Sequence, residues 1–293
     1  HRSRAEQDHQ GHDRAVPSDL ICVYIIQSQN TSASTMIAIP ADTYVISASV
    51  SVADLSAIDS VIDTVDIAET GLDMDTREQI GSTTEQIVAL QSFAIDLTEV
   101  TNVAYRACVD AGACPLPRES GNSLGDTYFN DPAFDQYPVT YVGWDAANTY
   151  CTWMGKRLPT TAEWEVAASH APATNRRYRY PWGDWFEPSR ANNVVSGTDG
   201  PRIVGYYQPA GNSPFGVVDM AGNVAEWTAV AQSSMESVQR EKQVVHSAVV
   251  KGGSYQDNRM LLRTDSQRIL PKSTTEAWLG FRCAISQVVH IKR

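Results

Sequence analysis

The stretch KGGSYQDNRMLLRTD, residues 251–265, holds the side chains best suited to binding or chemistry. It has no metal-binding cluster, and nothing around Ser254 resembles the nucleophile elbow that activates a serine hydroxyl. Arginine and aromatic side chains together are typical of binding hot spots. The candidate binding residues are Trp227, Tyr255, Asp257, Asn258, Arg259 and Arg263, with Trp278 as a further candidate. The alternative is that the arginines pair with nearby acids and only order the loop.

Composition favours one large folded body. The chain has 293 residues, 42% of them apolar, with seven Trp and twelve Tyr, which is enough for a sizeable core. The formal charge of −11 argues against a nucleic-acid partner, because such affinity comes from clustered Lys and Arg. No apolar run approaches the roughly 18 residues of a spanning helix, so we expect no membrane span in the chain.

Composition also divides the chain into segments. Residues 1–33 predict an extended N-terminal arm, 34–286 a folded domain, and 287–293 a C-terminal tail. Within the domain, residues 53–86 carry nine acids against one arginine and predict an acidic helical insertion. The first residue is His1 rather than Met, and we expect that upstream residues were removed or never included, a cleaved signal or anchor being one alternative.

Local patterns predict short elements joined by long loops. MIAIPADTYVI, residues 36–46, alternates as a strand does and has a bend at Pro40, and residues 87–96 predict another strand. Thr98 or Thr101 is the expected cap of a helix. A second helix follows Trp144 and stops at Gly155, and Thr160 with Glu163 forms a capping box before a third. Beyond residue 172 the chain predicts mostly irregular structure.

The cysteines predict an oxidising compartment. Cys108 and Cys114 flank the short turn-like spacer VDAGA, across which two sulfurs can meet. We therefore expect an extracytoplasmic location, in the periplasm, at the cell surface or secreted. Membrane association would come through a removed N-terminal segment or through a partner.

Six ordered motifs resemble the formylglycine-generating enzyme family, also called the sulfatase-modifying-factor domain. They are TEVTNVAY (98–105), PVTYVGWDAANTYCTWMGKRLPTTAEWEVAA (138–168), YPWG (180–183), FGVVDMAGNVAEW (215–227), KGGSY (251–255) and LGFRCA (279–284). The resemblance implies an α+β, C-type-lectin-like sulfatase-modifying-factor fold with short helices and strands and a high loop content.

The resemblance also implies a disulfide between Cys151 and Cys283. Closing a loop of about 130 residues is worth on the order of 4 to 5 kcal/mol in the chain-entropy model. Cys22 is then left over, either buried or paired with another chain.

A structural Ca²⁺ is a second implication of the resemblance. Its ligands map to Asn192, Gly222, Asn223, Val224 and Glu226, and carbonyl, amide and carboxylate oxygens are what this hard cation requires. The alternative is that Asn223 takes a left-handed turn and Glu226 caps a backbone amide.

The metal chemistry of catalytic relatives is not expected here. In catalytic members of the family, two cysteines placed two and seven residues after the tyrosine of GGSY hold copper, and those positions are Asp257 and Leu262 here. An iron-dependent branch uses a set of histidines, whereas only His170 and His246 lie within 34–286. We therefore expect no copper, no iron and no enzyme activity.

These observations predict a non-catalytic extracytoplasmic interaction or scaffold module. We expect it to be an accessory subunit with protein partners in a larger bacterial envelope or membrane-associated complex. The alternative is a peptide- or glycan-binding domain, and the least favoured reading is a metal-dependent oxidase with rearranged ligands.

Overall fold

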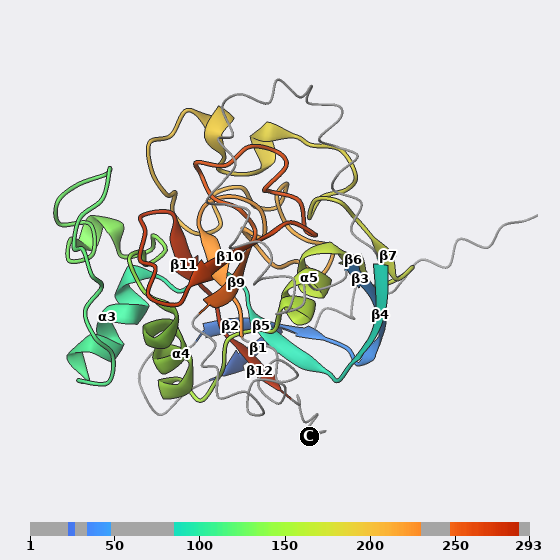
Figure 1. Cartoon of the computed structure of the whole chain (residues 1–293), viewed down its shortest axis with the longest axis horizontal. Helices are drawn as coiled ribbons and strands as arrows, with labels where there is room; N and C mark the ends of the chain where they lie inside the picture. Colours follow the sequence, from blue (N-terminus) through green and yellow to red (C-terminus); the bar gives the residue numbers. More distant parts are fainter. Residues whose placement is uncertain (1–22, 27–33, 48–84, 230–246, 287–293) are drawn as a thin grey trace, which may run out of the picture.

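The computed structural model describes residues 23–26, 34–47, 85–229 and 247–286. Most of the predicted arm (1–33), the acidic insertion (53–86) and the tail (287–293) fall outside the described residues, and Glu85 and Gln86 of that insertion begin a strand instead. Two four-stranded sheets, three α-helices and long loops make up the described body. The helices α3 (Asn102–Asp110) and α4 (Trp144–Trp153) lie on one side, and the ribbon of β3 (Asp42–Ser47) and β4 (Glu85–Leu90) lies on the other (Figure 1).

The first sheet joins the two ends of the domain. Its strands are β1 (Val23–Ile26), β2 (Ser34–Ile39), β5 (Phe93–Asp96) and β12 (Ala284–Ser286), in the order β1-β2-β5-β12 and all antiparallel. Apolar side chains of β2 and β5 pack against the helix α5 (Thr161–Ser169), whose Trp164 and Val166 are fully buried. This packing forms one of the main hydrophobic clusters.

The single strand predicted over 36–46, with a bend at Pro40, instead forms as two strands that belong to different sheets. β2 ends at Ile39 and β3 (Asp42–Ser47) begins after Pro40 and Ala41. The single strand predicted over 87–96 is wrong, because the chain divides into β4 (Glu85–Leu90) and β5. β4 pairs with β3 whereas β5 pairs with β2, so the chain must change partner at residues 91 and 92.

All three predicted helices form, each with a local signal at its end. Thr101, rather than Thr98, caps α3 (Asn102–Asp110). α4 (Trp144–Trp153) is followed by Gly155 at φ +71°, a conformation that favours glycine. Both halves of the Thr160–Glu163 capping box are present at α5. Short 3₁₀ turns occur at Pro132–Phe134, Pro188–Arg190 and Val194–Ser196.

The second sheet carries the 251–265 stretch. Its order is β10 (Gln267–Pro271), β9 (Ser247–Lys251), β8 (Ala225–Trp227) and β11 (Leu279–Phe281), with β8 and β11 parallel. β6 (His170–Ala171) and β7 (Arg176–Arg177) form a small ribbon. Residues 252–266 connect β9 to β10, so a hairpin fixes both ends of the candidate loop.

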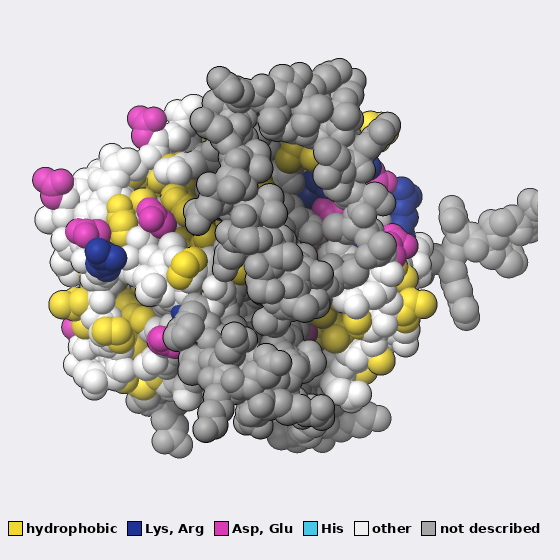
Figure 2. Space-filling model, viewed as in Figure 1, with side chains coloured by type: hydrophobic (Ala, Val, Ile, Leu, Met, Phe, Trp, Pro, Cys, Tyr) yellow, Lys and Arg dark blue, Asp and Glu magenta, His cyan; other side chains and the backbone are white. Residues whose placement is uncertain are grey.

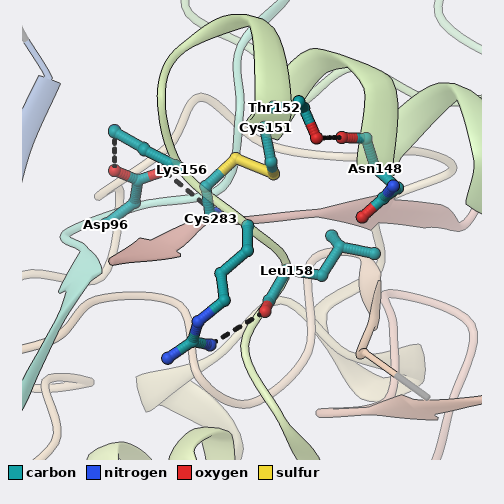
Figure 3. Close-up of a disulfide and its surroundings, with 8 residues drawn as sticks. Asp96, Asn148, Cys151, Thr152, Lys156, Leu158 and Cys283 are labelled. Atoms are coloured by element: carbon teal, nitrogen blue, oxygen red, sulfur yellow. Dashed lines mark hydrogen bonds and ion pairs between the residues drawn. A yellow bond between two sulfur atoms is a disulfide. The ribbon is translucent and has the colours of Figure 1, made fainter. Parts of the chain in front are cut away.

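Both predicted disulfides, Cys108–Cys114 and Cys151–Cys283, are present. The second ties α4 to the segment between β11 and β12. Beside it, Asp96 binds the Lys156 Nζ at 2.6 Å and accepts from the Cys283 N–H at 2.9 Å (Figure 3). Within the described part of the chain, none of the helices is both long and apolar enough to span a bilayer.

Candidate functional site

Asp257 is held from three directions within the β9–β10 loop. Its carboxylate accepts hydrogen bonds from the backbone N–H and the hydroxyl of Ser254 at 2.8 and 2.7 Å. It also forms an ion pair with Arg268, at 2.8 Å. The Arg268 guanidinium lies 4.3 Å from the centre of the Trp278 ring, a cation–π contact. The first position that would hold copper in catalytic members is therefore occupied by a fixed, buried carboxylate.

Leu262 occupies the second of those positions and is fully buried. It packs in an apolar cluster with Tyr180, Ala191 and Ala221. The backbone approaches closely here, because a Cβ on Gly253 would lie 2.7 Å from the carbonyl oxygen of Leu261. Leu262 therefore anchors the loop to the body.

The predicted binding residues divide into an inner and an outer group. Trp227 has no exposed surface, and its Nε1 donates to the carbonyl oxygen of Val142 at 3.0 Å. Tyr255 is also buried, and this burial raises the pKa of its hydroxyl. Arg263 binds Asp265 at 2.7 Å. Asn258 and Arg259 are the members of the set that the structure leaves exposed.

Two exposed valines lie beside the outer group. The backbone N–H of Val194 donates to the carbonyl oxygen of Asp257 at 3.1 Å, which places the 3₁₀ turn against the loop. Val194 and Val195 are 53% and 68% exposed. We call the surface formed by Val194, Val195, Gln256, Asn258 and Arg259 the loop face.

The turn predicted to bind calcium is tightly bonded internally. Asn223 has φ +62°, and its Oδ1 accepts from the Arg202 N–H at 2.8 Å and from Asn192 Nδ2 at 3.2 Å. Gly222, at φ +77°, lies so close to Asn192 that an added Cβ would be 2.0 Å from its carbonyl oxygen. The left-handed turn considered as the alternative is thus present at Asn223.

Glu226 is engaged by protein donors. Arg282 donates from Nε and Nη2 to its two carboxylate oxygens, both at 2.7 Å, and Trp164 Nε1 donates at 2.7 Å. Both partners of the ion pair have no exposed surface. The protein's own donors thus engage both oxygens of Glu226. The calcium assignment, with the backbone of Val224 in its ligand set, stays a prediction. No cluster of three or more His, Cys, Asp or Glu side chains suited to a metal occurs among the described residues.

Two further acids lie close to this ion pair. Burial, followed by the charge of Asp219, raises the pKa of Glu99 well above its ordinary value. Burial likewise raises the pKa of Asp219. Burial lowers the pKa of Arg282, but the charge and hydrogen bonds of Glu226 more than offset this, so its pKa rises. The field of the site therefore keeps Arg282 charged and favours a proton on Glu99.

Sequence reasoning missed Arg268 and the two valines. Arg268 follows Asp257 by eleven residues, and only the hairpin register, with Lys251 opposite Gln267, brings it back to the loop. A hairpin prediction around residues 251 and 267 would have found it. The valines precede the loop by more than fifty residues, so no local signal connects them with it.

The known proteins most informative for this chain carry different functional names. A relative from Chlamydia pneumoniae named serine/threonine-protein kinase pkn1 is 33% identical over 221 residues, covering 67% of this chain and 33% of the relative. The inactive C-alpha-formylglycine-generating enzyme 2 of Bos taurus is 33% identical over 165 residues, 51% of this chain and 50% of that protein. The hercynine oxygenase of Mycolicibacterium thermoresistibile is 34% identical over 163 residues, 48% of this chain and 36% of that protein. The chain thus spans between a third and a half of these relatives.

The fold has close structural neighbours. The structure of PvdO from Pseudomonas aeruginosa aligns with a TM-score of 0.61 at 20% identity and covers 91% of this chain and 98% of PvdO. At this identity the likeness concerns the fold alone. The predicted α+β, C-type-lectin-like architecture with short elements and many loops is confirmed.

The relatives correct one expectation from the sequence. We expected no enzyme activity, because Asp257 and Leu262 replace the copper-binding cysteines and only two histidines lie within 34–286. Relatives named hercynine oxygenase are enzymes, and one of them is 45% identical over 91 residues. The expectation is therefore wrong as drawn, because the loss of one ligand pair does not remove a chain from the catalytic branches of its family.

One family model covers almost the whole chain. The sulfatase-modifying factor enzyme 1-like domain matches residues 27–287. The match includes all six motifs, both disulfides and both four-stranded sheets apart from the first strand. This protein belongs to the family of the sulfatase-modifying factor enzyme 1-like domain.

Proposed function

We propose that this chain is an extracytoplasmic interaction module that binds a protein partner in a bacterial envelope assembly through the loop face. The observation that carries the proposal is the exposure of Val194 and Val195 beside Asn258 and Arg259 on a loop fixed from within. Adjacent apolar and arginine side chains are the combination that protein partners bury.

The fixed inner side of the loop favours binding energetically. Asp257 is bonded to Ser254 and Arg268, Leu262 is buried, and Tyr180 donates to the carbonyl oxygen of Arg259 at 3.0 Å. The backbone that carries Asn258 and Arg259 is thus ordered before a partner arrives. A preordered surface loses less conformational entropy on binding, which strengthens affinity.

Charge and disulfides support the type of partner and the compartment. A net charge of −11 disfavours nucleic acid, and on the face drawn in Figure 2 basic side chains occur beside acidic ones. Two disulfides between cysteines that are each at most 7% exposed support an oxidising, extracytoplasmic location.

Affinity capture with matched variants tests the proposal. The tagged protein is crosslinked in membranes of the organism that encodes it, and co-purified proteins are quantified by mass spectrometry. Val195→Asp and Arg259→Ala should each reduce a stoichiometric partner by about tenfold. Leu116→Asp and Arg118→Ala are the controls, because Leu116 is as exposed as Val195 (67% against 68%) and Arg118 is exposed outside the loop face. Equal capture by all four variants, or no stoichiometric partner, would refute the proposal.

A second candidate function is oxygenase chemistry, favoured by the relatives named hercynine oxygenase. The measurement is metal content of the purified protein, together with oxygen uptake in the presence of hercynine and added iron(II). Stoichiometric iron with hercynine-dependent oxygen uptake would establish this function. Background oxygen uptake with hercynine, also after addition of a thiol as the sulfur co-substrate, would count against this function.

A further inference from the structure

A groove separate from the loop face lies between the YPWG segment and residues 209–214. It has a volume of about 360 Å³, the size of small-ligand sites. Three prolines (Pro181, Pro209 and Pro214) and the aromatic side chains of Tyr178 and Trp182 form its apolar lining. The family motif YPWG therefore contributes surface as well as core.

The Trp182 ring is fixed. It stacks on Tyr180, with ring centroids 5.6 Å apart and planes within 10°, and its Nε1 donates to the carbonyl oxygen of Trp185 at 3.0 Å. Tyr180 does not line the groove, so the groove meets Trp182 on a side that Tyr180 leaves open. Trp185 itself is 82% exposed, so the segment also presents a second indole to solvent.

Two polar side chains complete the lining. Arg190 donates from Nε to Glu187 at 2.7 Å and from Nη1 to the carbonyl oxygen of Ala210 at 2.9 Å, which fixes its guanidinium and neutralises its charge. Asn212 also lines the groove, and its buried Oδ1 accepts no hydrogen bond from the described residues. A buried acceptor without a donor is unfavourable, so a bound hydroxyl would relieve that cost.

From these features we propose that the groove binds a neutral glycan. A pyranose ring has a flat C–H face, which packs on aromatic rings, and an edge of hydroxyls, which both donate and accept. Arg190 supplies donors and Asn212 supplies an acceptor. The pairing of Arg190 with Glu187 disfavours an anionic ligand. The engaged Nε1 of Trp182 disfavours a proline-rich peptide, which needs a side-chain donor for its carbonyls.

Direct binding measurements test the glycan groove. Saturation-transfer NMR on the intact protein would use maltotriose, cellotriose and N-acetylchitotriose at about 1 mM, with sialyllactose and decaproline as the acidic and peptide arms. We expect transfer to at least one neutral sugar. Trp182→Ala should raise its Kd by about tenfold and Asn212→Ala by about fivefold. Tyr206→Ala is the matched control, because Tyr206 is a 54% exposed aromatic outside the lining and should leave the Kd unchanged.

Asn212→Ala decides the question if Trp182→Ala fails to fold, since Trp182 packs against the Tyr180 cluster. The proposal is overturned if no neutral sugar shows transfer, if sialyllactose or decaproline alone binds, or if folded Asn212→Ala binds the sugar as tightly as the unchanged protein. Loss of the envelope partner by loop-face variants would not alter this result, because the two surfaces share no residue.

Discussion

At the residue scale, the Glu226–Arg282 ion pair lies in the core of the described body. Both side chains are fully buried, and Arg282 also donates to the carbonyl oxygens of Asp96, Leu97 and Val218. Removing one charge from such a pair leaves the other buried without its partner. Such a change is costly even where the intact pair adds little net stability.

Glu226→Gln should therefore lower the free energy of unfolding by about 3 kcal/mol or more. The measurement is urea unfolding followed by circular dichroism, once with excess calcium and once with EDTA. As the control, Glu187→Gln breaks the exposed Arg190 pair and should cost less than about 1 kcal/mol. A loss that is the same with calcium and EDTA fits a structural partner of Arg282. A loss seen only with calcium would instead identify Glu226 as a metal ligand.

In the candidate loop, the sequence shows that the two copper-binding cysteines are absent, and the structure shows what the residues at those positions do instead. That Asp257 and Leu262 cannot act as thiolates follows from their chemistry alone. Their opposite roles, one in an ion pair with Arg268 and one in an apolar cluster, depend on residues brought together by β-pairing. The exposure of Asn258 and the burial of Tyr255 depend on the same packing and have no local sequence signal.

At the element scale, the junction of α5 and β6 contains a titratable core residue. His170 has no exposed surface, its Nδ1 lies 2.9 Å from the Ser169 hydroxyl, and its ring meets Tyr44 edge-on. Burial lowers the pKa of His170 below its ordinary value of 6.5, an effect that Arg177 reinforces and Glu165 opposes. The neutral imidazole is therefore the form that this junction accommodates.

Because of His170, the free energy of unfolding should decrease as the pH is lowered. Below pH 6.5 the unfolded chain binds a proton at His170 more readily than the folded chain does. The stability that this residue contributes above pH 6.5 is therefore lost progressively as the pH falls from 6.5 to the lowered pKa of the folded state. Between about pH 7.5 and about pH 5, His170→Asn should show a shallower loss of unfolding free energy than the unchanged protein. Parallel pH profiles from urea unfolding would contradict this expectation, because they would mean that the pKa of His170 is the same in the folded and the unfolded chain.

Sequence patterns a few residues long predict helix ends well. Strand pairing between distant parts of the chain has no comparable local pattern. The T-x-x-E pattern at Thr160 gives the start of α5, and Gly155 marks the stop after α4, because capping is a local hydrogen-bond problem. The split between β4 and β5 was missed, because it depends on which distant strand each half meets. The parallel pairing of β8 with β11 is likewise fixed by residues more than fifty positions apart.

At the scale of the whole molecule, the last strands hold the two sheets together. β11 pairs with β8 in the second sheet, and after two residues β12 pairs with β5 in the first. Cys283 lies between them and is bonded to α4, so one cysteine links both sheets to a helix from the middle of the chain. The family resemblance predicted this bond, whereas spacing alone could only indicate the short Cys108–Cys114 bridge.

The two disulfides should differ in their effect on global stability, because the loops that they close differ in length. The chain-entropy model gives about 5 kcal/mol for the separation of 132 residues between Cys151 and Cys283, and about 2 kcal/mol for the separation of 6 between Cys108 and Cys114. In urea titrations, we expect the loss of unfolding free energy in the double variant Cys151→Ala/Cys283→Ala to be more than twice the loss in Cys108→Ala/Cys114→Ala. All four cysteines are at most 7% exposed, so the two double variants lose comparable packing. The difference between their unfolding free energies therefore measures the effect of loop closure. Equal losses would mean that the longer loop gives the Cys151–Cys283 bridge no greater stabilising effect than the Cys108–Cys114 bridge has.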